Sequence, residues 1–466
     1  MRLIQAMRLS LNSASPEVVA FSGAGGKSAA LFRLAGEIVA GGQRVVTTTT
    51  TRIAAGQIAH APAHLLVTGP EIDWARLEQA LDSHSHCLLL SDDQPPKAAG
   101  IDPRLVDALA RHAPELNLAA ILVEADGSAR RPVKAPDVHE PVIPDSTTLL
   151  VPVLGLDAIG LLLAEPHVHR PELLRGLLGI TDPTVRFTPE MAARLLLHPT
   201  GGQKGRPSAA RFLPLLNKAD SPTRRLVGRL IVHLLAVRGQ PSILASVGAL
   251  SESPVWERWG PTAAIVLAAG AARRMGSSKQ LLELDGEPLV VRAARLALES
   301  GANEALVITG AYAERVEAAL ADLQAQAGDR LRLVHNPAWE LGQASSIHAA
   351  VNGLSAQCQA ALFFPVDQPN LPAALLRRLW QPWRAGSDRV ATTISGEVRG
   401  APAIFDRRDF PALLALQGDQ GARPLLRIDA AEVATIPTTA RALADVDTPE
   451  DWERVLSIER DSEVLG

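Results

Sequence analysis

The sequence is poor in cysteine and in aromatic residues, and neither sign of charge predominates. Its 466 residues include two cysteines, Cys87 and Cys358, which lie far apart in the chain. They cannot build a disulfide framework or a four-thiolate zinc site, so a reducing cytoplasm is the simplest setting. Aromatic residues make up 3%, with a single tyrosine, which argues against stacking platforms for single-stranded nucleic acid. The 46 basic and 50 acidic residues give a net charge of −4, which predicts neither a nucleic-acid partner nor a membrane surface.

Long hydrophobic runs are also lacking. The most apolar stretch, residues 148–164, is shorter than the roughly 20 apolar residues that cross a bilayer, and Pro152, Gly155 and Asp157 interrupt it. Arg2 and Arg8 break the first segment before it reaches the length of a signal peptide. We therefore expect a cytoplasmic protein whose apolar segments form the cores of folded domains.

Short aliphatic segments alternate with helical patterns that end at glycine, which is typical of α/β folds with parallel sheets. We expect helices at residues 27–40 and from Pro288 to Gly301. The expected strands are residues 18–22, 44–48, 119–124, 263–268, 304–309, 331–335 and 361–366. The pattern predicts two nucleotide-binding domains, each opening with a strand, a glycine-rich turn and a helix.

The length also predicts more than one domain, because domains average roughly 150 residues and the chain has 466. Serine, proline and glycine gather in residues 251–261, where one apolar segment ends and a new strand begins. We expect a first domain at residues 1–250, a linker at 251–261 and a second domain at 262–466.

The second domain opens with AAIVLAAGAARRMGSSK, in which a buried strand runs into a glycine-rich loop. Small residues let the backbone approach a nucleotide closely, and free amide groups then face phosphate oxygens. Two cations in this loop would neutralise a triphosphate and the departing pyrophosphate. A tight turn between strand and helix is the structural alternative. The candidate nucleotide-binding residues are Leu267, Ala268, Ala269, Gly270 and Gly276, and the two candidate catalytic cations are Arg274 and Lys279.

Carboxylates follow at two places in the second domain. A strand leads into Asp367, at the edge where open α/β sheets bind ligands, and we expect this residue to be catalytic and to hold a metal. The string DVDTPED contains the other candidate metal ligand, Asp447. Carboxylate oxygens suit Mg²⁺, which prefers oxygen ligands. The structural alternatives are a turn capped by Asp367 and a helix capped by Thr448.

Taken together, these strings resemble the molybdenum cofactor cytidylyltransferases, the MocA-type members of the MobA-like NTP transferase family. The resemblance includes HNPAWELGQASSIH and GDQGAR and extends over residues 262–456. It implies a Rossmann-like, GT-A-like sheet and transfer of a cytidylyl group from CTP to molybdopterin cofactor, with Mg²⁺ as cofactor and pyrophosphate as product. Relatives that transfer a guanylyl group usually have glycine at the position of Ala269, whose methyl group leaves less room for a purine. Family members often have histidine at the position of Ala401, so a polar contact is missing there.

The first domain has its own phosphate-loop candidate, SGAGGKS, between a strand and a helix. In such loops backbone amides and a lysine hold phosphates, and the serine hydroxyl reaches Mg²⁺. The loop is more compact than a Walker A motif, because Phe21 stands where the first glycine is expected, and a purely structural turn is the alternative. The candidate residues are Gly23, Gly25, Gly26, Lys27 and Ser28, with Glu124 and Asp126 after a later strand to orient Mg²⁺ or water.

The string NKAD places Asn217 and Asp220 in the N-K-x-D form, in which a carboxylate pairs with the donors of guanine, although a solvated turn explains four residues equally well. Together with GAGGKS, EADGSARRPVKAPDVHEPVIP and HVHRPE, the string resembles the YqeC-type accessory proteins of selenium-dependent molybdenum hydroxylases, over residues 15–250. The resemblance implies a P-loop-like parallel sheet that binds GTP or ATP. It also implies a role in maturation, with a molybdenum hydroxylase apoenzyme as partner.

Two classes of function remain open. One is an enzyme that makes the cytosine dinucleotide cofactor, fused to an NTP-binding maturation module. The other is a carrier that delivers the cofactor and uses both sites as switches. Nucleotidyl transfer to a sugar phosphate, or from GTP or ATP, is a further alternative. The combination of Arg274, Lys279 and Asp367 favours the enzyme, since a binding module needs no cation pair and metal carboxylate around a leaving pyrophosphate.

Overall fold

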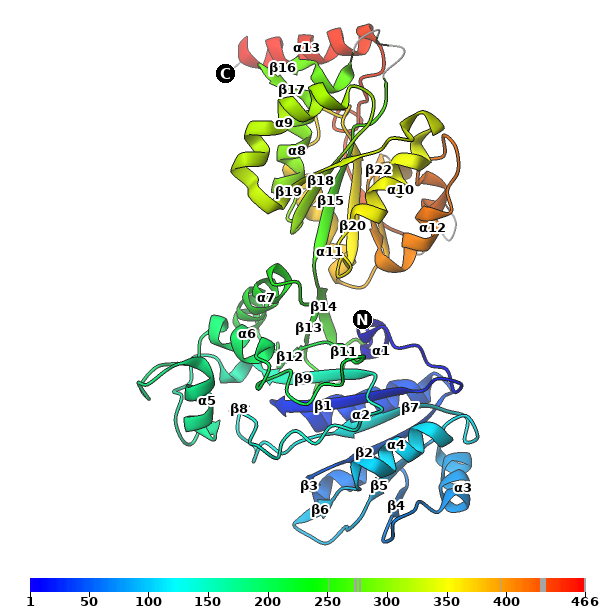
Figure 1. Cartoon of the computed structure of the whole chain (residues 1–466), viewed down its shortest axis with the longest axis vertical. Helices are drawn as coiled ribbons and strands as arrows, with labels where there is room; N and C mark the ends of the chain where they lie inside the picture. Colours follow the sequence, from blue (N-terminus) through cyan, green and yellow to red (C-terminus); the bar gives the residue numbers. More distant parts are fainter. Residues whose placement is uncertain (250, 272–274, 276–277, 395, 428–432, 465–466) are drawn as a thin grey trace. The chain divides into compact units, whose positions relative to one another are not determined.

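The computed structural model of the chain describes residues 1–249, 251–271, 275, 278–394, 396–427 and 433–464. It divides into two compact units, Met1–Trp259 and Gly260–Gly466. Both units are α/β, as the sequence predicts (Figure 1). Within the described part of the chain, no helix combines the length and the apolar character of a membrane span.

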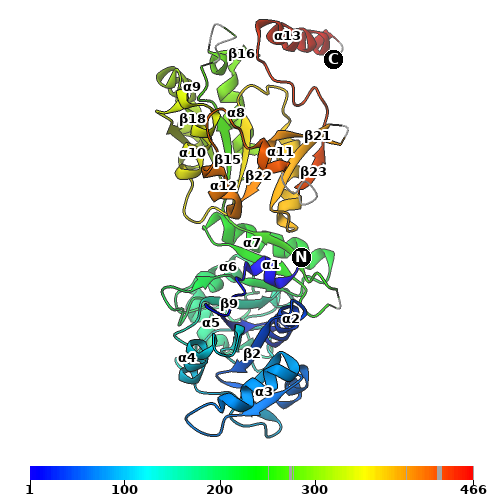
Figure 2. The same ribbon diagram turned by 90° about the vertical axis from the view of Figure 1, so that its right-hand side faces the viewer.

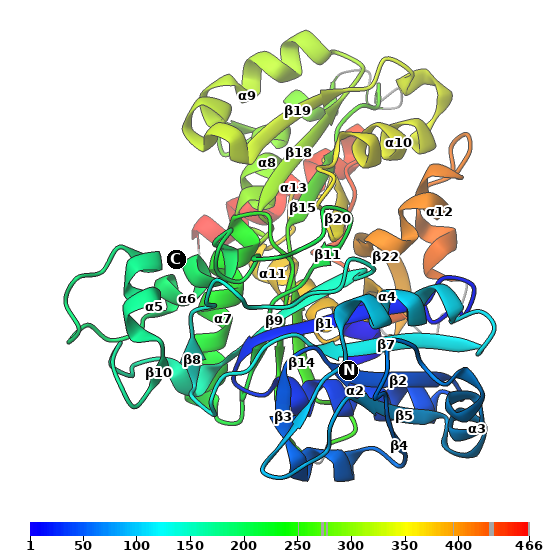
Figure 3. The same ribbon diagram turned by 60° about the horizontal axis from the view of Figure 1, so that its bottom comes forward.

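The N-terminal unit is built on one large sheet. Its strands are β1 (Glu17–Ala24), β2 (Arg44–Thr49), β4 (His64–Leu66), β5 (His86–Leu90), β7 (Leu118–Glu124), β9 (Leu149–Gly155), β11 (Arg211–Phe212), β12 (Leu215–Asn217), β13 (Ser242–Ala245) and β14 (Val255–Trp259). Their order is β14-β13-β12-β9-β1-β7-β2-β5-β4, with β11 beside β9, and Figure 3 shows β1, β7, β2 and β5 side by side. Two small sheets pair β3 (Arg52–Ala54) with β6 (Lys97–Ala99) and β8 (Val133–Lys134) with β10 (Val168–His169).

Helices cover both faces of this sheet. They are α1 (Leu3–Met7), α2 (Lys27–Ala40), α3 (Trp74–His84), α4 (Pro103–His112), α5 (Pro171–Leu178), α6 (Pro189–Leu197) and α7 (Pro222–Val237). Val19 and Phe21 of β1 pack in a cluster with α1 and α2, whereas Val18 packs in a cluster with α3 and α4. Strands buried on both faces have continuous apolar sequences, which is why the sequence reveals them.

The apolar stretch at residues 148–164, expected to form core, contains a fully buried strand, whereas the segment expected to be a linker contains an additional strand. Residues 149–155, within the longest apolar stretch, form β9 at the centre of the sheet beside β1. The segment expected to be a linker, residues 251–261, contains β14, which pairs with β13 as the antiparallel neighbour in an otherwise parallel sheet. β14 lies at the edge of the sheet and is paired on one side, so the side chain of its Trp256 is exposed to solvent. For the same reason its sequence lacks the continuous apolar run that is typical of interior strands.

The C-terminal unit is built on a seven-stranded sheet. Its strands are β15 (Thr262–Leu267), β18 (Glu304–Thr309), β19 (Leu331–His335), β20 (Ala360–Pro365), β21 (Arg389–Ile394), β22 (Glu397–Asp406) and β23 (Val433–Pro437). Their order is β19-β18-β15-β20-β22-β21-β23, and β18, β15, β22 and β21 can be followed across the sheet in Figure 2. The sheet is mixed, because β22 runs antiparallel to both neighbours. A small hairpin joins β16 (Glu283–Leu284) and β17 (Glu287–Pro288).

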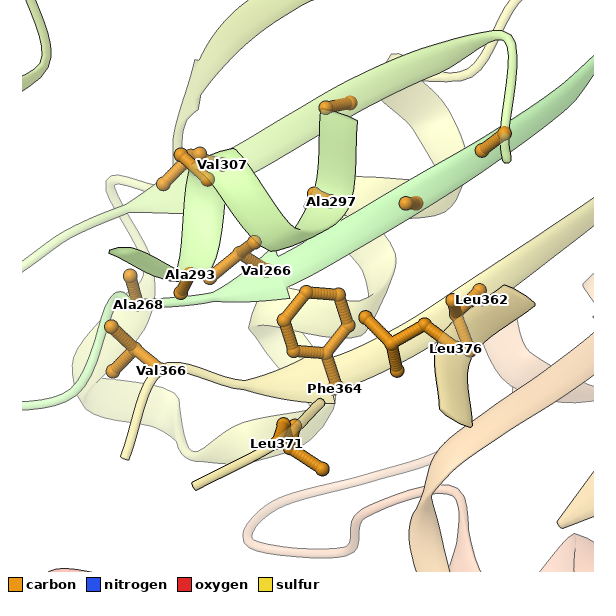
Figure 4. Close-up of a cluster of buried hydrophobic side chains, with 14 of the residues drawn as sticks. Val266, Ala268, Ala293, Ala297, Val307, Leu362, Phe364, Val366, Leu371 and Leu376 are labelled. Atoms are coloured by element: carbon orange, nitrogen blue, oxygen red, sulfur yellow. The ribbon is translucent and has the colours of Figure 1, made fainter. Parts of the chain in front are cut away.

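Helices also cover both faces of the second sheet. They are α8 (Leu289–Glu299), α9 (Ala313–Ala327), α10 (Gln343–Gly353), α11 (Ala373–Arg384), α12 (Phe410–Leu414) and α13 (Pro449–Val464). On one face, Val266 and Phe364 pack with Ala293 of α8 and Leu376 of α11 (Figure 4). Complete burial of a phenylalanine contributes roughly 2–3 kcal/mol. Ile265 points to the other face and packs with α10 and α12. The two clusters hold β15 and β20 as rigid neighbours.

Candidate functional site

A cavity of about 450 Å³ lies at the carboxyl ends of β15 and β20. These strands are parallel neighbours, with Leu267 opposite Pro365, so the segments that follow them meet at one edge of the sheet. The start of α10 and two acidic residues from later in the chain complete the lining. Among the lining residues are Ala269, Gly270, Lys279, Asp367, Asp419 and Asp447.

Three of the predicted site residues meet at one side of this cavity. Lys279 Nζ lies 2.8 Å from Oδ2 of Asp367 and 2.7 Å from Oδ1 of Asp447. Burial acts to lower the pKa of Lys279, but the two carboxylates outweigh it and raise the pKa above its ordinary value. The lysine is therefore a charged ammonium group held between two carboxylates. A single cation can thus reach Asp367 and Asp447 together.

The glycine-rich loop forms another wall. Leu267 ends β15 and lines the cavity together with Ala269 and Gly270. The methyl group of Ala268 instead packs in the hydrophobic core, so this residue lies beside the cavity and does not line it (Figure 4). The predicted residues Arg274 and Gly276 lie outside the described residues.

Gln280 is a candidate that the motif reasoning missed. Its buried side chain donates from Nε2 to the carbonyl oxygens of Ala268, at 2.9 Å, and Gly270, at 2.6 Å. Its Oε1 accepts from Ser278 Oγ at 2.9 Å. The carbonyl of Ala269 accepts a backbone N–H. Because three successive carbonyls are engaged with the protein, the loop is suited to present N–H donors to a phosphate. The available signal was its position next to Lys279.

The residues at the start of α10 also line the cavity. Gly342 precedes this helix with φ of +101°, a conformation that favours glycine. A Cβ atom at Gly342 would lie 2.6 Å from Oδ1 of Asp419, so side chains are excluded there. The N–H of Ala344 donates to the carbonyl of Gly418 at 3.0 Å. The GDQGAR string is thus fixed to the start of α10, and Asp419 reaches the cavity.

In the N-terminal unit, the phosphate-loop candidate follows β1 and runs into α2. Gly23, Gly25 and Gly26 have φ of +89°, +100° and +122°, which favour glycine. A Cβ atom at Gly25 would lie 2.1 Å from the backbone nitrogen of Gly155, at the end of β9. Close packing between neighbouring strand ends therefore requires glycine in this loop.

Lys27 and Ser28, at the start of α2, lie beside two acidic residues at the end of β7, where Glu124 is the last residue of the strand and Asp126 follows it. Lys27 Nζ donates to the carbonyl of Gly23 at 2.8 Å and lies 3.3 Å from Oδ1 of Asp126 and 3.7 Å from Oε1 of Glu124. Ser28 Oγ donates to Oε2 of Glu124 at 2.6 Å. Burial raises the pKa of Glu124 against the opposing effects of Lys27 and Ser28. For Lys27, burial acts to lower the pKa, but Asp126 and Glu124 outweigh it and raise it.

Further charges extend this buried group. Lys134 Nζ lies 2.9 Å from Oδ2 of Asp126 and 2.7 Å from Oε2 of Glu140, and Arg170 donates to the same oxygen of Glu140 at 2.8 Å. Lys134 is 4% exposed, so it belongs to the interior although it comes from a polar stretch of sequence. Positive and negative groups alternate from Lys27 outward, which compensates the cost of burying each charge.

The structure brings one residue of the NKAD string to the phosphate loop and leaves the other at the surface. Asn217 Nδ2 donates to the carbonyl of Gly25 at 2.8 Å, and its Oδ1 accepts from the N–H of Val247 at 3.0 Å. Asp220 is exposed, with its carboxylate 3.5 Å from Nη1 of Arg224. Asn217 is therefore a structural tie between the loop and the end of β13.

Protein oxygens that suit Mg²⁺ occur in both units. Among the described residues, no three histidine, cysteine or acidic side chains gather as ligands for one ion. Asp367 and Asp447 in the C-terminal unit, and Ser28 with Glu124 in the N-terminal unit, each supply oxygen atoms near a lysine. Mg²⁺ binds through one or two carboxylates with substrate phosphates and water, so both sets fit this ion.

Comparison with known proteins gives a separate match for each unit. The family model described as YqeC protein matches residues 19–172, and the model described as MobA-like NTP transferase domain matches residues 264–435. The YqeC protein of Escherichia coli (strain K12) is 34% identical over 204 residues, which cover 44% of this chain and 76% of that protein. Nicotine blue oxidoreductase of Paenarthrobacter nicotinovorans is 34% identical over 200 residues, which cover 41% of this chain and 95% of that protein.

Solved structures also resemble the chain. Rv0371c from Mycobacterium tuberculosis H37Rv is 26% identical, with a TM-score of 0.37, and the match covers 42% of this chain and 98% of that one. The family matches occupy successive parts of the sequence and do not overlap. The chain therefore belongs to the YqeC family in its N-terminal part and to the MobA-like NTP transferase family in its C-terminal part, and is a fusion of a YqeC domain with a nucleotidyltransferase domain.

Proposed function

We propose that the C-terminal unit transfers a cytidylyl group from CTP to the terminal phosphate of molybdopterin cofactor. A phosphate oxygen of the pterin attacks the α-phosphorus of CTP, the bond between this phosphorus and the bridging oxygen of the β-phosphate breaks, and pyrophosphate leaves with that oxygen. The products are the cytosine dinucleotide cofactor and pyrophosphate. Positioning and neutralisation of charge supply the rate, so no covalent enzyme intermediate is needed.

The observation that carries this proposal is the group of Lys279, Asp367 and Asp447 at the side of the cavity. Lys279 would hold the β- and γ-phosphates and stabilise the charge of the leaving pyrophosphate, and Arg274 would share this role. The loop of Ala269 and Gly270 would receive phosphate oxygens on its N–H groups. Mg²⁺ held by Asp367 and Asp447 would neutralise charge on the phosphate oxygens.

The shape of the loop supports a pyrimidine nucleotide. Ala269 is buried at the wall of the cavity, and a Cβ atom added to neighbouring Gly310 would lie 2.8 Å from its methyl group. The methyl group thus has little freedom to move aside for a larger base. The sequence strings shared with the cytidylyltransferases support CTP independently of this geometry.

The proposal predicts the nucleotide and acceptor requirement of the full chain. Pyrophosphate release, measured with each of the four nucleoside triphosphates, should require both CTP and molybdopterin cofactor, because the acceptor phosphate is the nucleophile. Release driven by a sugar phosphate would contradict the molybdenum assignment. Binding of CTP and cofactor without any release would identify the chain as a carrier. Since the assay measures pyrophosphate, it also separates this reaction from the oxidoreductase activity named for one relative.

Gln280 is expected to matter for the reaction as a positioning residue. Replacing it with leucine leaves the carbonyls of Ala268 and Gly270 without their donor, and each buried unpaired group costs about 1–3 kcal/mol. The loop should then turn these carbonyls toward the phosphates, so KM for CTP should rise by about tenfold or more. Steady-state pyrophosphate release against CTP concentration measures this change, and exposed Gln357→Leu is the matched control. An unchanged KM for CTP in Gln280→Leu would show that Gln280 does not position the glycine-rich loop for the nucleotide.

The N-terminal unit supports a second function, binding of a nucleoside triphosphate in a module that serves maturation of a molybdenum hydroxylase. The observation that favours it is the contact of Ser28 Oγ with Glu124 at 2.6 Å, beside Lys27 and three glycines with positive φ. The backbone amides of Gly25 and Gly26, together with Lys27, would hold the phosphates. Ser28 and Glu124 would hold Mg²⁺, which would neutralise charge on the phosphate oxygens. The apoenzyme of the hydroxylase would be the protein partner.

A further inference from the structure

The turn after β12 is attached to the phosphate-loop candidate by a buried amide. Asn217 donates to the carbonyl of Gly25 and accepts from the N–H of Val247. A Cβ atom at Gly26 would lie 2.4 Å from Nδ2 of Asn217, so the side chain lies directly against the loop. A nucleotide whose phosphates occupy this loop would therefore have the turn as its neighbour.

The side chain of Lys218, the next residue, passes the backbone of Gly155, which packs against the phosphate loop at Gly25. The φ of Lys218 is +64°, a left-handed conformation that costs free energy for a residue with a side chain. Its Nζ forms an ion pair with Oδ2 of Asp157 at 2.6 Å, which fixes the end of the lysine side chain. A Cβ atom at Gly155 would lie 3.5 Å from Cδ of Lys218 and 3.0 Å from Cα of Gly25. The methylene groups of Lys218 therefore lie close to the phosphate loop and are partly exposed.

Asp220 completes the turn with an available carboxylate. Its side chain is 53% exposed and its ion pair with Arg224 spans 3.5 Å, and such exposed pairs are weak. A carboxylate accepts two adjacent N–H donors, which guanine offers at N1 and at its 2-amino group. Adenine has an acceptor at N1 and lacks the 2-amino group, so the same carboxylate repels it.

We propose that this turn is a guanine-selective base site, with Asp220 accepting from the base edge and the Lys218 methylene groups packing against the base face. The inference rests on the proposed phosphate site of the N-terminal unit and adds the identity of the base. Asn217 holds the turn in place and is a positioning residue. Its contacts are with the phosphate loop and with Val247, and it has no role in reading the base.

The test exchanges the hydrogen-bonding pattern at Asp220. Binding of GTP, XTP, ATP and tripolyphosphate to the full chain is measured by calorimetry with Mg²⁺ present. The wild-type chain should bind GTP at least tenfold more tightly than ATP or XTP. Xanthine carries a carbonyl in place of the 2-amino group, so Asp220→Asn should lose affinity for GTP by at least tenfold and gain affinity for XTP by a similar factor.

The matched control is Asp145→Asn. Asp145 is exposed and precedes the amino end of β9, whereas the phosphate loop follows the carboxyl end of the parallel strand β1, so this variant should leave all four affinities unchanged. Since Asp220 belongs to the N-terminal unit, an exchange of GTP for XTP cannot arise in the C-terminal cavity. Equal binding of GTP and ATP, or an Asp220→Asn variant with the wild-type preference, would overturn the guanine site and leave the phosphate site standing. Failure of every one of these ligands to bind would overturn the phosphate site as well.

Discussion

Replacement of Asp367 with asparagine is expected to lower the rate of nucleotidyl transfer by roughly 10³-fold, equal to about 4 kcal/mol of transition-state stabilisation. Asparagine has nearly the same size but carries no charge. The asparagine side chain would no longer neutralise the charge of Lys279, which lies 2.8 Å from Oδ2 of Asp367 in the wild-type chain. It would also no longer hold a metal ion near the phosphates. The lysine keeps Asp447 at 2.7 Å, so the fold should survive. The turnover number measures the loss, and thermal unfolding of the variant verifies the fold.

Two further variants make this result specific. Asp447→Asn should have a smaller effect than Asp367→Asn, because the side chain of Asp447 is 38% exposed and that of Asp367 is 20% exposed. Solvent can therefore replace more of the interactions of Asp447. Asp329→Asn, at an exposed position after α9, should retain the wild-type rate. A near wild-type rate in Asp367→Asn would show that this carboxylate has no part in the reaction.

Most interior strands could be predicted from the sequence, because both faces of each sheet are buried. The predicted strand at residues 304–309 coincides with the interior strand β18, and the predicted helix at residues 27–40 coincides with α2. The predicted strand at residues 331–335 coincides with β19, which lies at the edge of its sheet. The antiparallel strand β14 lies at the edge of its sheet with the mixed sequence VWERW, and β22 contains Gly400 and Pro402, which are uncommon inside strands. Their local patterns therefore did not distinguish them from a linker or from further parallel strands.

The residues of the C-terminal site that follow directly after strands could also be predicted from the sequence. Asp367 follows β20 and the glycine-rich loop follows β15, and parallel pairing of these strands places both at one edge. The direction of the Lys279 side chain was not readable, because it depends on two carboxylates that lie 88 and 168 residues away in sequence. Gln280 was missed for a different reason, because its partners are nearby backbone carbonyls that only the folded loop presents to its side chain.

Replacement of Lys27 with methionine is expected to destabilise the N-terminal unit and to abolish phosphate binding there. Methionine fills the space of the buried side chain but leaves Glu124 and Asp126 without the cation that lies 3.7 Å and 3.3 Å away. Removing one partner from a buried ion pair costs about 3–5 kcal/mol, and the lower value applies because Asp126 retains Lys134 at 2.9 Å. Hydrogen exchange of the amides in β1 and β7 measures this loss within the unit.

A second substitution, at Asp126, tests whether the loss of stability in Lys27→Met arises from the unbalanced buried charge or from lost packing. In the double variant Lys27→Met/Asp126→Asn one buried negative charge has gone, so part of the protection in β1 and β7 should return while phosphate binding stays absent. Lys97→Met, at an exposed position in β6, should change neither property. If Lys27→Met retained wild-type protection and still bound tripolyphosphate, Lys27 would be neither the balancing cation nor the phosphate ligand. If the double variant were less protected than Lys27→Met, removal of a carboxylate hydrogen-bonded to the N–H of Gly23 would outweigh the relief of charge.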